Sequence, residues 1–206
     1  MADYFEIRAD YNQHTITVYQ AYNDAIADVA VRNGRFGAPF SFNRMTWIKP
    51  SFMWMMERSN WGLKKDQQRI LAIRIKRTFF DTLLEQSVLT TPEAHVYPHA
   101  GIWETLFAQA NVYVQWDPER SINGKKLEHR SLQLGISRNL ISQFNEDAIV
   151  AIDDLTPLVR KCHNLLINGK TTQAKSFLPP EKIYPVSAAA RKALGMKNSG
   201  DKYAPI

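Results

Sequence analysis

Three segments of the chain alternate β-branched or aromatic side chains with other residue types, which is typical of strands with two different faces. They are TITVYQAY (15–22), RILAIRIKR (69–77) and RSLQLGIS (130–137). Shorter runs that favour extended structure are RMTWI (44–48), NVYVQWD (111–117) and DAIVAIDDL (147–155). The pattern therefore predicts about five or six strands spread along the chain.

Short helices are predicted between these strands. Asn23 or Asp24 is a suitable cap for the first helix, and Gly34 ends it. Pro50 and Ser51 open the second. Further helices are expected at 79–87, 138–144, 156–170 and 188–196, with a loop over 90–101. Because the chain has neither a regular strand–helix repeat nor a GxGxxG turn, we predict an α+β fold.

Composition limits the classes to which the protein can belong. Its 206 residues are 45% apolar and 22% charged, as in globular domains. We predict a single domain over residues 1–170, followed by a basic, proline-containing arm over 171–206. The one cysteine, Cys162, forms no internal disulfide and is expected in the core. No apolar run approaches the ~20 residues of a membrane span, so we expect no membrane partner and a cytoplasmic location.

Positive charge is concentrated in one stretch of the chain. The net charge is +6. The stretch 58–77 contains seven basic residues and a single acidic residue, Asp66. Such a patch suits a phosphate-bearing ligand, and an ordinary solvated surface is an equally good interpretation.

Standard catalytic signatures are absent from the sequence. It contains no GxSxG, Walker, HExxH or CxxC motif. His95 and His99 are four residues apart, but Pro98 between them disfavours the helix that would bring them together. We therefore expect no metal site.

Two segments are candidates for chemistry. Arg44, Trp47 and Lys49 lie where a strand leads into a helix, and such a group can clamp a phosphate and stack a planar ring. The neighbouring Trp54, Met55 and Met56 are assigned to the core. In the second segment, DPERSINGKK (117–126), the carboxyl groups of Asp117 and Glu119 could act as a general acid and a general base. The same residues are also typical of a turn, and we prefer this second interpretation.

The chain resembles a known family through IRADYNQHTITVYQAY, PFSFNRMTWIKPSFMWMMERSNWG, VQWDPERS and RSLQLGIS. These segments look like a widespread bacterial and fungal family of domains of unknown function, over about residues 6–185. That resemblance implies no activity.

The order of elements is also similar to that of ADP-ribosyltransferases, which bind NAD in a cleft between two small antiparallel sheets. This resemblance implies split antiparallel sheets with interleaved short helices. It places Tyr19, Gln20 and Tyr22 where the family carries His or Arg on its first strand, and Gln133 where it carries an acidic residue or Gln on a late strand. A glutamine lacks the charge that stabilises an oxocarbenium-like transition state, so Glu119 would supply the carboxylate.

The resulting hypothesis is an enzyme that transfers ADP-ribose from NAD, or binds a related nucleotide, with nucleic acid as one candidate acceptor. Arg44 and Lys49 would hold the diphosphate, with Ser51 also assigned to cofactor binding. Tyr19, Tyr22 and Trp47 would stack the ring, Gln133 would orient the ribose and Glu119 would polarise the acceptor. The alternative is a non-enzymatic module that binds DNA or RNA through residues 58–77 and the basic arm.

Overall fold

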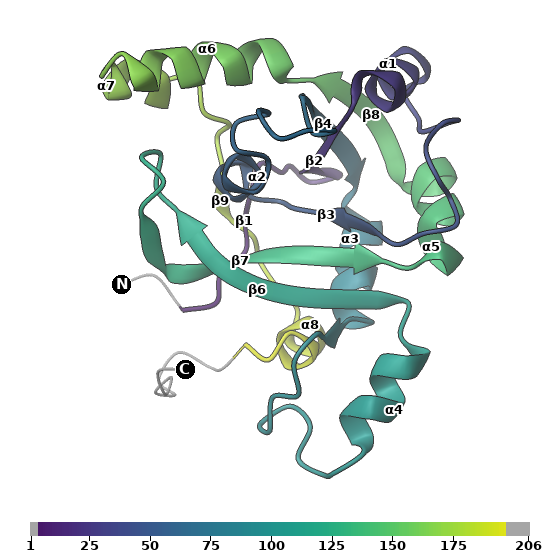
Figure 1. Cartoon of the computed structure of the whole chain (residues 1–206). Helices are drawn as coiled ribbons and strands as arrows, with labels where there is room; N and C mark the ends of the chain where they lie inside the picture. Colours follow the sequence, from purple (N-terminus) through teal and green to yellow (C-terminus); the bar gives the residue numbers. More distant parts are fainter. Residues whose placement is uncertain (1–3, 197–206) are drawn as a thin grey trace.

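The computed structural model describes residues 4–196. This part of the chain is an α+β fold in which short helices separate the strands, as predicted (Figure 1). The strands are β1 (Arg8–Ala9), β2 (Thr15–Tyr22), β3 (Thr46–Ile48), β4 (Arg69–Lys76), β5 (Val88–Leu89), β6 (Val112–Arg120), β7 (Lys126–Ile136), β8 (Ile149–Asp154) and β9 (Lys182–Ile183). The helices are α1 (Asp24–Asn33), α2 (Phe52–Ser59), α3 (Arg77–Glu85), α4 (Ile102–Gln109), α5 (Arg138–Gln143), the π-helical η1 (Phe144–Ala148), α6 (Thr156–Ile167), α7 (Thr171–Lys175) and α8 (Ala188–Ala193).

Two sheets form the centre of the molecule. One is antiparallel, with the order β2-β4-β8, and the other has the order β3-β7-β6-β5. In Figure 1 the long strands β6 and β7 lie below the first sheet. The second sheet is mixed, because β5 pairs with β6 in parallel. The prediction of purely antiparallel sheets is therefore wrong at this edge.

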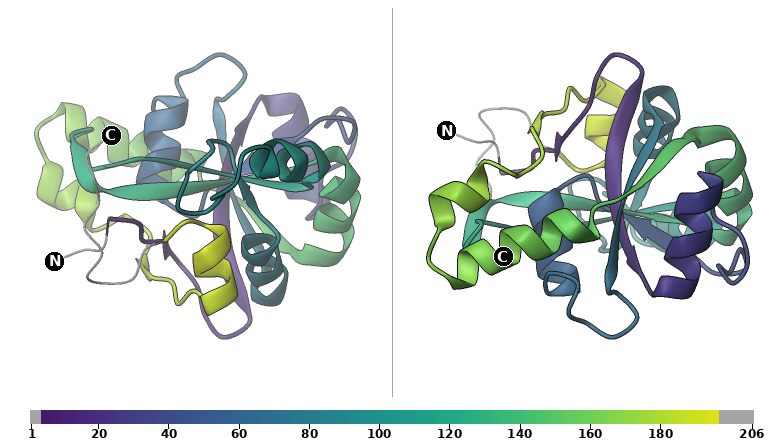
Figure 2. Two further views of the ribbon diagram at one scale, coloured as in Figure 1. Left: turned by 90° about the horizontal axis from the view of Figure 1, so that it is seen from below. Right: turned by 90° about the horizontal axis from the view of Figure 1, so that it is seen from above.

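A backbone bridge between β2 and the end of β3 joins the two sheets. Tyr19 N donates to Lys49 O at 2.7 Å, and Lys49 N donates to Tyr19 O at 3.3 Å. Seen from above and below, β2 runs across the direction of β6 and β7 (Figure 2). The two sheets therefore cross near the bridge, and the candidate site lies beside it.

The predicted helix caps are present at both helices next to the bridge. Asn23 Oδ1 accepts from Ile26 N at 3.1 Å, and Gly34, in the left-handed region with φ 62°, ends α1. Ser51 Oγ accepts from Trp54 N at 3.1 Å and caps α2. These local signals fix where β2 and β3 give way to helices, and so where the side chains of the site emerge.

One helix was not predicted, and one predicted turn is wrong. Residues 102–109, which we did not assign to a helix, form α4. The expected turn at DPER is also absent, since β6 continues to Arg120 and the chain turns only at 121–125. Pro118 fits in the strand because the β6–β7 register shifts between Pro118 and Arg120, and proline is tolerated at such bulges.

The C-terminal segment packs against the rest of the protein. Its β9 pairs with β1, and Tyr184, Ala190 and Leu194 are buried in the main core. The last residues of the basic arm, 197–206, lie outside the described residues.

The residues assigned to the core are buried as expected. Cys162 is fully buried, and Trp54, Met55 and Met56 are buried on α2. Across residues 4–196, no helix has the length and apolar character needed to span a bilayer. The same residues include no group of three or more His, Cys, Asp or Glu side chains arranged to hold a metal ion.

Candidate functional site

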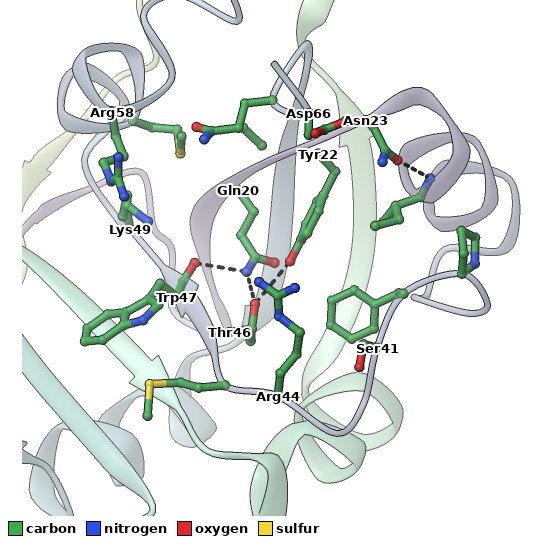
Figure 3. A pocket seen from close by; sticks show the side chains of 17 residues that line it. Gln20, Tyr22, Asn23, Ser41, Arg44, Thr46, Trp47, Lys49, Arg58 and Asp66 are labelled. Atoms are coloured by element: carbon green, nitrogen blue, oxygen red, sulfur yellow. Dashed lines mark hydrogen bonds between the residues drawn. The ribbon is translucent and has the colours of Figure 1, made fainter. Parts of the chain in front are cut away.

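A cavity of about 550 Å³ lies beside the β2–β3 bridge. Its walls come from the end of β2, the start of α1, the 39–45 loop, β3, α2 and the segment after α2. Figure 3 shows the side chains that line it. Five of the residues singled out in the sequence are brought together here: Gln20, Tyr22, Arg44, Trp47 and Lys49.

The other four candidate residues do not line this cavity. Tyr19 lies on the opposite face of β2 and packs edge-on against Phe52 in a separate cluster. The Ser51 hydroxyl is used as the α2 cap. Glu119 and Gln133 are buried on β6 and β7. The crevice that was expected to contain both Arg44 and Gln133 therefore contains only Arg44.

A hydrogen-bonded group connects β2 and β3 across the cavity. Gln20 Nε2 donates to Thr46 Oγ1 at 2.6 Å and to the Trp47 carbonyl at 3.0 Å. The Tyr22 hydroxyl shares a hydrogen bond of 3.1 Å with Thr46 Oγ1, and burial raises the pKa of Tyr22 to about 12. Gln20 Oε1 is buried and has no hydrogen-bond partner among residues 4–196. Since a buried acceptor without a donor is costly, this oxygen favours a ligand that brings an N–H or O–H group.

Three cations from different parts of the chain line the same cavity. Arg44 precedes β3, Lys49 follows β3, and Arg58 lies on α2. Figure 3 shows Lys49 and Arg58 on one wall and the Arg44 guanidinium below Gln20 and Tyr22. No ion pair of these three side chains is found within residues 4–196. Asp66 is the one acidic residue in the lining, so the cavity attracts anions.

Lys49 is the buried member of this set, with 5% of its surface exposed, whereas Arg44 and Arg58 are exposed. Burial and the nearby Arg58 together lower the pKa of Lys49 to about 8, against the opposing effect of Asp117. The wall of the cavity thus carries an ammonium that gives up its proton more readily than an ordinary lysine.

Trp47 lies across a glycine of the neighbouring strand. Gly135 is its partner in the β3–β7 register. A Cβ at this glycine would come within 3.0 Å of the indole atoms Cη2 and Cζ2, and within 2.9 Å of Met45 Sδ. The missing side chain therefore lets Trp47 and Met45, which both line the cavity, approach the β7 backbone.

Gln133 holds a carboxylate instead of facing the cavity. Its Nε2 donates to Asp117 Oδ2 at 2.7 Å, and Gln115 Nε2 donates to Asp117 Oδ1 at 2.9 Å. Burial raises the pKa of Asp117 even though both amides and Lys49 favour its charged form. Of the acid pair in the sequence, Asp117 is thus the member that acts electrostatically on Lys49.

Glu119 belongs to a different environment. Its Oε1 accepts from Arg120 N at 2.8 Å, and its charge acts on Glu181, whose Oε1 accepts from Phe52 N at the start of α2. Burial, with a contribution from Glu119, raises the pKa of Glu181 to about 8. This placement does not favour contact between Glu119 and a ligand in the cavity.

The basic stretch 58–77 is not one continuous surface. Arg69 binds the carboxylates of Asp24, Asp28 and Asp154. Three further bases have partners of their own: Arg74 with Asp153, Arg77 with Tyr184, and Lys64 with the Arg58 carbonyl. The apparent patch is therefore divided among internal contacts, and Arg58 alone of its members joins the cavity lining.

Our sequence reasoning missed Thr46 and the specific role of Arg58. Arg58 was visible only as one of seven bases, although it lies three residues after Met55 and so on the same face of α2. Thr46 gave no signal, because its importance depends on Gln20, which is 26 residues away in the chain.

Together these features define an α+β protein with an anion-attracting cavity at the junction of two sheets. The sequence profile of a family described as a domain of unknown function (DUF4291) matches residues 6–184. The chain belongs to this family, as its resemblance to a domain family of unknown function predicted. No curated protein matches the chain.

Proposed function

We propose that the cavity binds NAD or a related dinucleotide and that the protein transfers its ADP-ribosyl group to an acceptor. The observation that carries this proposal is the convergence of Arg44, Lys49 and Arg58, without carboxylate partners among residues 4–196, on one cavity. Guanidinium groups form strong, charge-assisted hydrogen bonds to phosphate oxygens. A cavity of about 550 Å³ is within the usual range for small-molecule sites.

The position of the cavity supports the dinucleotide class. It lies between two sheets, which is where ADP-ribosyltransferases, to which the element order is similar, bind NAD. Trp47 and Tyr22 supply aromatic surface for a planar ring, and the unpaired Gln20 Oε1 suits an amide N–H of the nicotinamide. Arg44 and Arg58 at the mouth, together with protonated Lys49, would hold the diphosphate.

The roles proposed for Gln133 and Glu119 change with this geometry. Gln133 becomes a positioning residue that holds Asp117, whose charge acts on Lys49. Glu119 has no role in this version of the proposal, since it contacts Arg120 and acts on Glu181.

Isothermal titration calorimetry with NAD tests binding. We expect a measurable heat at millimolar NAD or below, and about tenfold weaker binding in Arg44→Ala and in Arg58→Ala, equivalent to about 1.4 kcal/mol each. Lys65→Ala is the matched control, because Lys65 is an exposed base outside the cavity lining. Absence of heat at millimolar NAD, or equal affinity in Arg44→Ala, would contradict the proposal.

Release of nicotinamide tests the transfer step separately. We expect the wild-type protein to release nicotinamide from NAD when an acceptor is present, and Asp117→Asn to slow the release. Binding without any release would limit the function to nucleotide binding.

The alternative of a nucleic-acid-binding module is less well supported. It needs a continuous row of free bases, whereas Arg69, Arg74 and Arg77 have partners within the fold. Nucleic acid stays a candidate acceptor in the main proposal.

A further inference from the structure

Lys49 differs from the two arginines of the cavity. Its side chain is almost fully buried but still lines the cavity, on the same wall as Arg58 (Figure 3). Within residues 4–196 no hydrogen bond or ion pair occupies this amine. A buried ammonium normally requires a partner to offset its loss of hydration, and Lys49 lacks one.

The charges around Lys49 do not neutralise it. Arg58 of α2 and Arg44 of the loop before β3 add positive charge to the same cavity. Asp117 of β6 acts on the amine from a distance greater than a salt bridge, and Asp66 lies at the exposed edge of the lining. Tyr22 of β2 is neutral at physiological pH.

These surroundings favour the neutral amine. With its pKa lowered by burial to about 8, roughly half of Lys49 is unprotonated at that pH, compared with about 0.4% for an ordinary lysine. Only the neutral form is nucleophilic. Desolvation and a neighbouring cation are the two conditions that activate lysines for reaction with carbonyl carbons.

The cavity also selects the ligand that would meet this amine. The exposed Arg44 and Arg58 can hold a phosphate, and the amine of the buried Lys49 belongs to the lining of the same cavity. We propose that Lys49 is a nucleophile that forms an imine with the aldehyde carbon of a phosphate-bearing ligand. The amine nitrogen bonds to the carbonyl carbon, a proton moves from nitrogen to the carbonyl oxygen, and the carbinolamine loses water. No oxidant, reductant or metal enters this reaction.

This proposal shares the cavity with the proposed function but goes beyond it. The open-chain ribose of ADP-ribose is one phosphate-bearing aldehyde, and phosphorylated aldehydes in general form the class. Imine formation therefore does not require that NAD be the physiological ligand.

Pyridoxal 5′-phosphate is the probe, because it carries both an aldehyde and a phosphate. The full-length protein is incubated with probe below one equivalent, reduced with borohydride and mapped by peptide mass spectrometry. We expect Lys49 to be labelled at least tenfold faster than Lys65, and inorganic diphosphate to slow this labelling. Arg44→Ala should slow it several-fold. Lys49→Arg should remove the label at this position and leave labelling of other lysines unchanged, whereas Lys65→Arg should leave Lys49 labelling intact.

The outcomes separate this inference from the proposed function. Labelling spread evenly over surface lysines, or unaffected by diphosphate and by Arg44→Ala, overturns the nucleophile assignment. If NAD binds in the calorimeter but Lys49 is not labelled, the inference fails and the proposed function stands. If Lys49 is labelled but NAD gives no heat, the proposed function fails and this inference stands. A melting curve of Lys49→Arg confirms that a lost label reflects the missing amine and not unfolding.

Discussion

At the scale of single residues, Gly135 controls the wall of the cavity. A methyl group at this position would lie within 3.0 Å of the Trp47 indole and 2.9 Å from Met45 Sδ. The methionine can bend away, but the ring must move as a whole. We expect Gly135→Ala to displace Trp47 and to lower the free energy of unfolding by about 1–3 kcal/mol, the usual cost of overpacking.

The displacement is measurable by NMR as a shift of the Trp47 indole N–H resonance, alongside chemical denaturation. Gly37→Ala is the matched control, since its new Cβ would meet only Val29 Cγ1 at 3.3 Å and Gly37 does not line the cavity. An unchanged Trp47 resonance in Gly135→Ala would mean that the glycine is not needed for the close approach.

Individual residues differ in how well the sequence predicted their place in the site. Arg44, Trp47 and Lys49 were recognisable because they are close in sequence at a strand–helix junction. The role of Gln133 was not, because its contact with Asp117 depends on how β6 and β7 align. The burial of Lys49 was equally hidden, since it results from packing of distant segments around β3.

At the scale of elements, the start of α2 is held by a carboxylate from the C-terminal segment. Glu181 Oε1 accepts from Phe52 N at 2.6 Å. Burial, Glu119 and Asp10 raise the pKa of Glu181 to about 8, against the effect of that hydrogen bond. The folded-state pKa is above the unfolded value of about 4.3. The contribution of this group to stability is therefore full below pH ~4.3 and lost as the pH rises through about 8.

Glu181→Gln keeps an acceptor for Phe52 N and removes the charge. We expect the variant to be more stable than the wild type at pH 9, by on the order of 5 kcal/mol, because each pK unit is worth about 1.4 kcal/mol, and equally stable at acidic pH, where Glu181 is already protonated. Urea denaturation at several pH values measures this difference. Glu104→Gln, an exposed acid on α4, should change little. A variant that is less stable at pH 9 would show that the charged form holds α2.

Elements also differed in how well their patterns predicted them. The alternation of residue types in β2 and β4 predicted both strands correctly, because their apolar side chains pack in the core. Helix α4 was missed because it starts at Gly101 without a side-chain cap and has no buried residue to give it an apolar stripe. The Asp117–Pro118 pair favoured a turn in the sequence, but the bulge in β6 accommodates the proline within the strand.

At the scale of the whole molecule, Arg69 ties three elements together. From β4 its guanidinium reaches Asp24 and Asp28 of α1, at 3.1 and 2.6 Å, and Asp154 of β8, at 2.8 Å. Burial alone would raise the pKa of Asp154, but hydrogen bonds from Thr156 and Arg69 bring it below its ordinary value. Because α1 begins at the cavity, this network links the stability of the fold to the position of the site.

Replacing Arg69 by methionine removes these bonds but keeps much of the apolar stem. Asp24 and Asp28 are mostly exposed, so their pairs contribute little, and the loss comes mainly from Asp154. We expect Arg69→Met to lower the free energy of unfolding by about 2 kcal/mol and the melting temperature by about 5 °C. Lys65→Met, at an exposed base, should stay within about 0.5 kcal/mol of the wild type.

The pH dependence of Arg69→Met identifies the cause. A carboxyl with a lowered pKa stabilises the fold above its unfolded pKa of about 3.9, and this stabilisation is lost as the pH falls through the folded value. The wild type should therefore lose its advantage over Arg69→Met on acidification, and the two denaturation midpoints should converge below pH ~3. If the difference in stability between the wild type and Arg69→Met stays constant across this pH range, the effect comes from packing of the arginine stem. The charge network would then not be what holds α1 in place.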